Sequence, residues 1–150
     1  MYNFDMEKIT QFEPRPVLKF WNPGLDFVGV IQCLGEIRHI TKTVNMKSDV
    51  DVVDVRIIKG RETVEETYEE MGREKTRTYQ KQYENEERTL TLSKSVLHTE
   101  VPNLSPLKGQ KIFIAGRGKK SGRNFKYDDY IVLEEHVAKE RGLVREEPAS

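Results

Sequence analysis

The chain has almost nothing to crosslink it and little apolar material to spare. It contains one cysteine, Cys33, in 150 residues, which excludes an internal disulfide bond and a zinc site built from several cysteines. Hydrophobic residues make up only 36% of the chain, and no apolar run approaches the ~18 residues of a membrane-spanning helix. The first ten residues include Asp5 and Glu7 and lack the apolar block of a secretory signal. We therefore expect a soluble intracellular protein, cytoplasmic or inside a host cell, that is not secreted.

Net charge is also lacking, because 25 Lys and Arg balance 25 Asp and Glu. A global positive field that would attract polyanions is therefore excluded. The charges are nevertheless segregated along the chain, which is more informative than their sum. Residues 108–126 contain no acid and carry Lys108, Lys111, Arg117, Lys119, Lys120, Arg123 and Lys126. Residues 62–70 contain no base and carry Glu62, Glu65, Glu66, Glu69 and Glu70.

The length fits about one domain, and the apolar, β-branched and aromatic runs predict mainly strands. The expected strands are 27–40, 50–58, 88–92, 111–115 and 125–133. Gly29 and Gly35 are candidate bulges in the first of them. The connections are expected to be a loop with one short helical turn at 96–107, a basic turn at 116–122 and a short terminal helix at 134–141.

Residues 61–88 form the most polar stretch, and two interpretations compete for it. Val64, Tyr68 and Met71 have helical spacing, whereas the many threonines and tyrosines favour strands. The Met71-Gly72 pair supplies a turn that would set an acidic arm (62–70) against a basic one (73–81). A long polar hairpin is the preferred prediction, and a charged helix is the alternative.

Together these elements predict an all-β chain, a small antiparallel Greek-key barrel with five strands. We expect the barrel to span 17–141, with 61–88 as a long charged hairpin insertion and a short C-terminal helix at its end. Residues 1–16 are then a flexible lead-in and residues 142–150 a flexible tail.

The most informative segment is 107–133, which has the pattern of an apolar strand, a glycine-rich basic tip and an aromatic strand. Such a tip attracts phosphates, and exposed aromatic rings can stack unpaired bases. The alternative is a hairpin turn that merely aids solubility. The candidate nucleic-acid-binding residues here are Lys111, Arg117, Lys119, Lys120, Arg123, Phe125, Lys126 and Tyr127. Trp21 could stack a base or close a barrel end, and Tyr79 and Tyr83 lie among basic residues that could extend the site.

No pattern points to an enzyme, a cofactor or a metal site. His39, His98 and His136 share no ligand spacing, and Asp49 and Asp51 are more simply acids at a strand end. Residues 116–121 resemble a phosphate-binding loop but fail its Gly-x-x-x-x-Gly-Lys-Ser/Thr spacing.

Two segments carry a resemblance to a known family. They are Phe-Trp-Asn-Pro-Gly-Leu-Asp-Phe-Val-Gly-Val-Ile (20–31), and Leu-Lys-Gly-Gln-Lys-Ile-Phe-Ile (107–114) followed by Gly-Lys-Lys-Ser-Gly-Arg-Asn-Phe-Lys-Tyr-Asp-Asp-Tyr-Ile-Val (118–132). They resemble the first, fourth and fifth strands of OB-fold proteins, most closely small viral and phage single-stranded-DNA-binding-like proteins. Residues 59–88 depart from that pattern. The resemblance implies a five-stranded OB-type barrel.

The expected function is sequence-independent binding of single-stranded nucleic acid, DNA more than RNA, to coat or protect strands in replication or recombination. The alternative is an OB-type interaction or structural module whose 61–88 arm docks a partner or a second subunit. A nuclease that uses the abundant acids is a weaker third hypothesis. The first two differ in one observable, because only the first needs Phe125 and Tyr127 to be exposed beside the basic tip.

Overall fold

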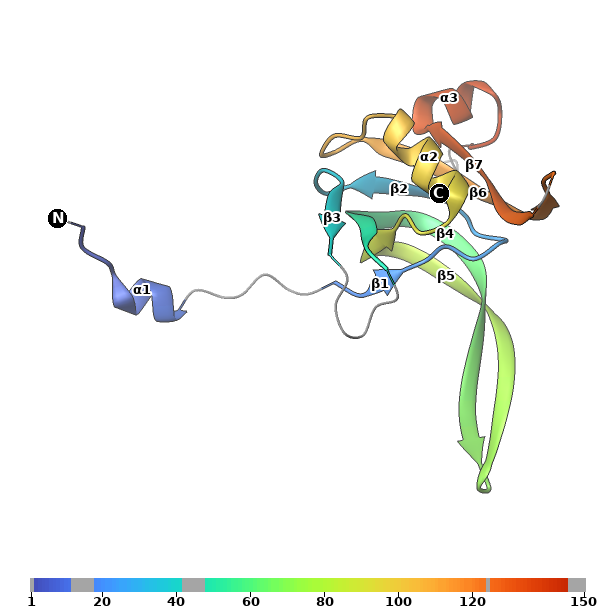
Figure 1. The fold of residues 1–150 in the computed structure, drawn as a ribbon, viewed down its shortest axis with the longest axis horizontal. Coiled ribbons are helices and arrows are strands. Elements are labelled where there is room, and N and C mark those ends of the chain that lie inside the picture. Colours follow the sequence, from blue (N-terminus) through green and yellow to red (C-terminus); the bar gives the residue numbers. More distant parts are fainter. Residues whose placement is uncertain (1, 12–17, 42–47, 124, 146–150) are drawn as a thin grey trace, which may run out of the picture.

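The computed structural model of the chain describes residues 2–11, 18–41, 48–123 and 125–145. Most of them belong to one strongly curled sheet with three short helices around it (Figure 1). The elements are α1 (Met6–Gln11), β1 (Phe20–Trp21), β2 (Val28–Cys33), β3 (Arg38–Ile40), β4 (Val50–Glu70), β5 (Arg73–Thr91), α2 (Ser95–Asn103), β6 (Lys111–Ser121), β7 (Lys126–Glu134) and α3 (Glu135–Glu140). The mainly β composition and the short C-terminal helix are confirmed. None of the described helices is long and apolar enough to cross a membrane.

The strands follow the order β1-β5-β4-β2-β6-β7, and β3 pairs with β4 beside that path. All neighbours are antiparallel except β1, which runs parallel to β5. The sheet has seven strands where the sequence predicted five, because Phe20–Trp21 adds a strand and the first predicted strand divides in two. Within the described residues the ladder ends at β1 and β7, so the sheet is curled but not closed by hydrogen bonds.

The predicted first strand, 27–40, is wrong as a single element. It breaks between β2 and β3, where the Leu34 amide donates to the Asp54 carbonyl at 2.8 Å. The irregularity within β2 lies between Val30 and Ile31, and neither Gly29 nor Gly35 forms it. Gly29 serves close approach instead, because a Cβ there would lie 2.8 Å from the Phe27 ring and 2.5 Å from the Lys59 carbonyl oxygen.

The loop predicted at 96–107, with one short helical turn, proves more helical than expected, because α2 occupies Ser95–Asn103. Leu97 and Val101, one helical turn apart, are fully buried and face the core. Pro102 lies in the last turn, where it ends the helix. The helix therefore depends on this apolar pair, which the core buries.

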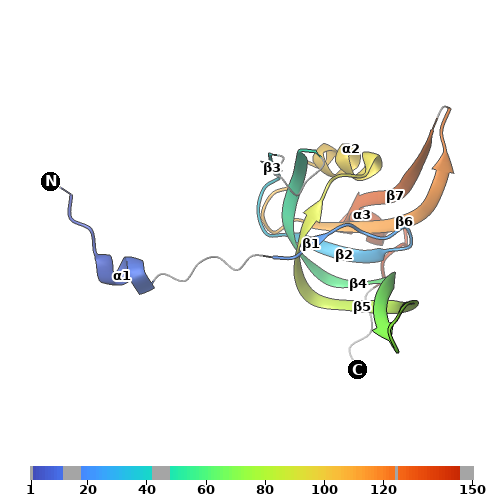
Figure 2. The same ribbon diagram turned by 60° about the horizontal axis from the view of Figure 1, so that its bottom comes forward.

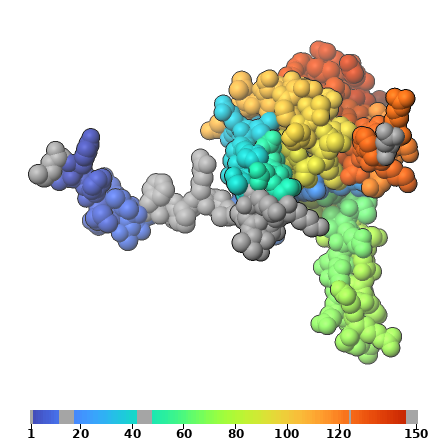
Figure 3. Space-filling model, in the orientation of Figure 1, coloured from blue at the N-terminus to red at the C-terminus, as the bar shows by residue number. Residues whose placement is uncertain are grey.

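The hairpin prediction for 61–88 is confirmed, and the helical alternative is wrong. β4 and β5 pair in one register from Val52 opposite Thr91 to Glu70 opposite Arg73, with a local interruption at Asn85, whose φ is 52°. Met71 and Gly72 form the turn with φ of 54° and 73°, both left-handed, as a tight hairpin turn requires. Beyond Arg61, β4 pairs only with β5, so residues 62–82 form an arm that projects from the body (Figures 1 and 3).

The predicted lead-in contains α1, in which no residue is buried. Residues 1 and 12–16 of that lead-in, and residues 146–150 of the predicted tail, lie outside the described residues.

Candidate nucleic-acid interface

The predicted basic turn at 116–122 is wrong, because β6 continues as a strand through Ser121. β6 and β7 pair from Ile112 opposite Glu134 to Ser121 opposite Lys126, with an irregularity between Gly116 and Lys119. Gly118 has a φ of +76° and its amide donates to the Leu25 carbonyl at 3.2 Å. This bulge adds a residue to β6, and Lys120 therefore lies directly opposite Tyr127.

The end of this hairpin brings together cations and aromatic rings. The side chain of Phe125 is 66% exposed, and its ring lies edge-on to Tyr127 with centroids 6.3 Å apart. The Gly122 amide donates to the Phe125 carbonyl at 2.7 Å and so closes the hairpin. Lys120, Arg123 and Lys126 are exposed at the same end of the hairpin, and Lys120 lies directly opposite Tyr127. We call these residues the tip patch: Lys120, Arg123, Phe125, Lys126 and Tyr127.

Two cations of the predicted site are already paired with acids of β7. Arg117 Nε lies 3.5 Å from Asp129, and Lys119 Nζ lies 3.5 Å from Asp128. Asp128 is shared with Lys94, at 3.4 Å. For the three cations of the tip patch, in contrast, the described part of the chain shows no ion pair within 4.0 Å. The net positive charge is therefore concentrated at the end of the hairpin.

The base of the hairpin is fixed by a buried polar contact. Lys94 Nζ donates to the Tyr130 hydroxyl at 2.7 Å and to the Pro23 carbonyl at 2.8 Å, and the Tyr130 hydroxyl donates to the same carbonyl at 2.6 Å. Burial, assisted by the charge of Asp128, raises the pKa of the Tyr130 phenol. Tyr130 is consequently a neutral anchor in the core.

Trp21 and Tyr83 are buried, and their predicted role in base stacking is wrong. Only 6% and 5% of their surfaces are exposed. Trp21 Nε1 donates to Glu62 Oε2 at 3.4 Å, and the Tyr83 hydroxyl donates to Glu62 Oε1 at 3.0 Å. The Trp21 ring lies 4.8 Å from that of Phe27. The alternative that placed Trp21 in the core is confirmed.

Tyr79 is exposed, but it lies on the arm. Its ring and that of Tyr68 lie 6.0 and 5.4 Å from the guanidinium carbon of Arg77. The arm and the β6–β7 hairpin extend in different directions in both ribbon views (Figures 1 and 2). Lys111 is exposed at the opposite end of β6. The structure thus separates Tyr79 and Lys111 from the tip patch.

A histidine and aspartate cluster escaped sequence reasoning because its members are far apart in the chain. His39 lies 2.7 Å from Asp51 and 3.3 Å from Asp49, and His98 lies 3.4 Å from Asp51. These hydrogen bonds, chiefly that of Asp51, raise the pKa of His39. Among the described residues, no group of three or more His, Cys, Asp or Glu is arranged to hold a metal ion. We therefore interpret the cluster as a surface ion-pair network.

Comparison with models of protein families, with curated proteins and with solved structures finds no match for the chain. No relative therefore supplies an activity or a ligand, and function has to be inferred from the geometry of the tip patch.

Proposed function

We propose that this protein is an OB-type barrel that binds single-stranded nucleic acid, DNA rather than RNA, with little sequence preference. It acts as a binding protein and not as an enzyme, and it coats or protects strands during replication or recombination. One observation carries the proposal: the exposed ring of Phe125 and the Tyr127 ring lie at the end of a hairpin that also carries three exposed cations, for which the described residues offer no ion pair within 4.0 Å.

The strand order supports the OB-type part of the proposal. The long strands β2, β4 and β5 form a meander, and β2 also pairs with β6, which pairs with β7. Helix α2 lies between the third and fourth of these strands in the chain. This is the arrangement expected of a partly open five-stranded Greek-key barrel, to which β1 and β3 are short additions.

The mechanism follows from the properties of the two kinds of side chain. The compact ammonium groups of Lys120 and Lys126 hold backbone phosphates as point charges. The guanidinium group of Arg123 can hold a phosphate through two hydrogen bonds. Phe125 offers a largely exposed ring to an unpaired base, and every base has a face that can stack on it. Duplex DNA hides its base faces, so the ring contributes only to single-strand binding.

Fluorescence anisotropy of a labelled oligonucleotide tests the proposal. Phe125→Ala should weaken single-strand binding by about 1–3 kcal/mol, the range for one stacked base. Tyr79→Ala removes an exposed ring from the arm and is the matched control, which should bind as wild type. An RNA strand and a duplex of equal length should both bind more weakly than single-stranded DNA. Equal losses in the two variants, or no detectable binding by folded wild type, would contradict the proposal.

A further inference from the structure

The arm has two faces of different composition. Directly opposite residues in neighbouring strands point to the same face, and so do alternate residues along one strand. The register of β4 and β5 therefore divides the outer arm into two sets. The mixed face holds acids, bases and rings: Val64, Glu66, Tyr68, Glu70, Arg73, Lys75, Arg77 and Tyr79. The threonine face holds only threonines, glutamates and a glutamine: Thr63, Glu65, Thr67, Glu69, Glu74, Thr76, Thr78 and Gln80.

The mixed face pairs acids with bases inside the arm. Glu66 pairs with Arg77 at 2.7 Å, and Glu70 pairs with Lys75 at 3.6 Å. Both ion pairs join β4 to β5. This face therefore helps to hold the two strands of the arm together without a partner.

The threonine face carries negative charges that the arm leaves unbalanced. In the part of the chain that the structure describes, Glu65, Glu69 and Glu74 form no ion pair within 4.0 Å. Glu69 lies directly opposite Glu74, and like charges in that position destabilise a ribbon. These acids therefore weaken the isolated arm, and cations from a partner would relieve the repulsion.

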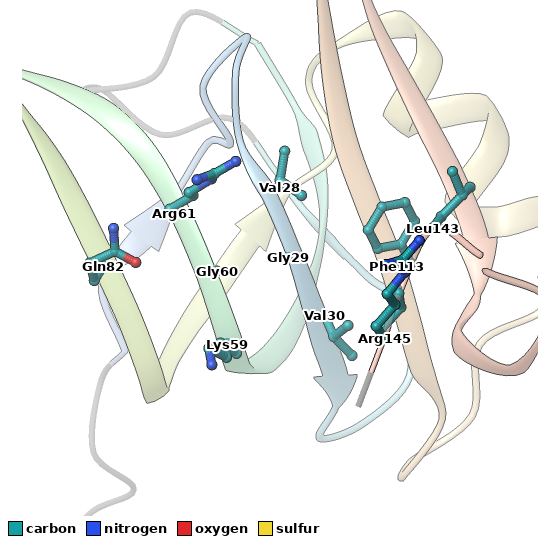
Figure 4. A pocket seen from close by; sticks show the side chains of 11 residues that line it. Val28, Gly29, Val30, Lys59, Gly60, Arg61, Gln82, Phe113, Leu143 and Arg145 are labelled. Atoms are coloured by element: carbon teal, nitrogen blue, oxygen red, sulfur yellow. The ribbon is translucent and has the colours of Figure 1, made fainter. Parts of the chain in front are cut away.

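Towards the body, the same face of β4 and β5 becomes mixed in charge. Arg61 lies two residues before Thr63, and Lys59 lies directly opposite Glu84. Both cations border a groove of about 440 Å³ that crosses β4, β2 and β6 (Figure 4). Bases and an acid thus lie together beside the body, and the purely acidic surface is confined to the outer arm beyond Thr63.

The tip patch has the charge that the threonine face lacks. Its Lys120, Arg123 and Lys126 are exposed and form no ion pair within 4.0 Å with the described residues. Phe125, at the same end of the hairpin, is 66% exposed. An exposed ring and three cations at one hairpin end are complementary to an acidic surface with apolar groups at its centre.

The centre of the threonine face supplies those apolar groups. Thr67 lies directly opposite Thr76, and both are exposed. Glu65 and Glu69 lie two residues to either side of Thr67, about 7 Å along the strand. Aromatic rings pack favourably on β-branched side chains. The Phe125 ring can therefore lie on the two threonines while the cations reach the glutamates.

We propose that the threonine face of one copy of the chain docks on the tip patch of a second copy. Phe125 then packs on the paired threonines, and the tip cations pair with the three glutamates. The arm and the β6–β7 hairpin of one copy extend in different directions, so the contact joins two copies (Figures 1 and 2). Because it joins two different surfaces, each copy can dock on the next, and a chain or a ring of copies forms.

Docking by the arm regulates the proposed nucleic-acid site. The glutamates take the place of phosphates at the tip patch, so the arm and a nucleic-acid strand exclude each other. Exposed ion pairs contribute little individually, whereas a strand gains affinity from the counterions that it releases. A single strand should therefore displace the arm. This displacement rests on the proposed function, whereas the docking itself does not.

Sedimentation velocity at increasing protein concentration tests the docking. Wild type should form larger species at about 50 mM salt and lose them at about 500 mM, because salt screens exposed ion pairs. The arm variant, Glu69→Lys with Glu74→Lys, should weaken self-association at least about tenfold, because attraction becomes repulsion. The control, Glu100→Lys with Glu140→Lys, makes the same change of charge at exposed positions of α2 and α3 and should match wild type. Unchanged thermal unfolding shows that both variants fold.

Reversing the charge of both surfaces is the sharpest test. The tip variant, Lys120→Glu with Lys126→Glu, should lose self-association as the arm variant does. A combined variant with the substitutions of both has a basic arm and an acidic tip, so its copies should recover most of the lost affinity. A substitution that only damages the fold cannot be rescued in this way. The combined variant should still fail to bind single strands, which separates docking from nucleic-acid binding.

The failures of the two proposals are distinguishable. If wild type stays monomeric at low salt, if the arm variant and its control behave alike, or if the combined variant does not recover, the docking proposal is wrong and the proposed function is unaffected. If self-association follows the charge pattern and a single-stranded oligonucleotide releases it, both proposals stand. If the oligonucleotide binds without releasing it, the regulation is wrong. If the oligonucleotide does not bind at all, the docking stands and the proposed function is wrong.

Discussion

At the residue scale, Glu62 is the most consequential side chain that the sequence concealed. Its carboxyl group is 7% exposed and accepts hydrogen bonds from Trp21, Tyr83 and the Gly24 amide, the last at 3.2 Å. In the sequence it is only the first of the five glutamates in residues 62–70. In the structure it joins β1, β5 and the turn before β2 at the base of the arm.

Glu62→Ala should destabilise the fold by about 1–3 kcal/mol, because it leaves buried donors without an acceptor. Glu62→Gln should retain much of the stability, since its amide oxygen still accepts. Glu65→Ala, an exposed neighbour on the same strand, is the control and should stay within about 0.5 kcal/mol of wild type. Urea unfolding measures all three, and equal effects of the two alanine variants would show that Glu62 is not an anchor.

The contribution of His39 to the stability of the fold should be greater at low pH than at high pH. Hydrogen bonds to Asp51 and Asp49 raise the pKa of His39 above its ordinary 6.5 in the folded chain. The protonated ring therefore stabilises the fold fully below the unfolded pKa, and this contribution disappears as pH rises through the folded pKa. His98, which also contacts Asp51, faces the same carboxylate.

The difference in melting temperature between wild type and His39→Gln should thus be larger near pH ~5.5 than near pH ~8.5. Titration of the His39 ring by NMR should show the raised pKa directly, and Asp51→Asn should return it towards the ordinary value. A gap in melting temperature that grows with pH would contradict this account.

At the element scale, the arm consists of a base that packs on the body and an outer part that is exposed. The sequence did not show where the base ends. Glu62 and Tyr83 are buried, but every residue from Glu69 to Gln80 is exposed. A two-stranded ribbon in water is marginally stable by itself. Thr63 ties the arm to the body, because its hydroxyl and its amide both donate to Asp26, the amide at 3.1 Å. These hydrogen bonds, chiefly that of the hydroxyl, lower the pKa of Asp26.

Deleting residues 65–78 and joining the ends with two glycines should leave a cooperatively folding body. The deleted part buries little apolar surface, so the melting temperature should fall by only a few degrees, about the effect of 1 kcal/mol. Deleting 62–83 instead should lower it far more, because Glu62 and Tyr83 go with the arm. Differential scanning calorimetry compares the two, and similar losses would show that the outer arm belongs to the core.

The elements that sequence reasoning found are those with strong local signals. The β4–β5 hairpin follows from opposite charges and the Met71-Gly72 turn, and the run of Ile112 to Ala115 marks the first half of β6. The errors of the prediction arise where contacts between residues far apart in the chain determine the local structure. The β6 bulge depends on Gly118 reaching the Leu25 carbonyl, and α2 depends on a core that accepts Leu97 and Val101.

The candidate site was predictable in composition but not in detail. The proximity of Phe125, Tyr127 and basic residues follows from their closeness in the chain. The burial of Trp21 and Tyr83 cannot be predicted in this way, because it requires the pairing of β1 with β5. The ion pair of Lys119 with Asp128 cannot be predicted from the sequence either, because the β6–β7 register depends on the bulge.

At the scale of the whole molecule, a neutral chain can still bind a polyanion because its charges are distributed unevenly in space. On the arm, Glu66 pairs with Arg77 at 2.7 Å and Glu70 with Lys75 at 3.6 Å. The three cations of the tip patch are exposed at the end of the β6–β7 hairpin, and the described residues give them no ion pair within 4.0 Å. Binding should therefore depend on salt like that of a small basic protein, despite the zero net charge.

The steepness of the salt dependence follows from the number of phosphate contacts. Each phosphate contact to a single strand contributes about −0.7 to the slope of log K against log salt. Three contacts at the tip patch give a slope of about −2. Anisotropy titrations of a single-stranded oligonucleotide between about 50 and 200 mM salt measure this slope.

Substitutions separate charge from stacking within the same experiment. Lys120→Glu should weaken binding to all sequences alike and flatten the slope by at least ~0.7. Lys119→Glu should do less, because Lys119 already shares its charge with Asp128. Phe125→Ala should lower affinity with the slope unchanged, since a ring releases no counterions. A slope near zero in folded protein, or equal effects of the two lysine variants, would favour the interaction module over the nucleic-acid binder.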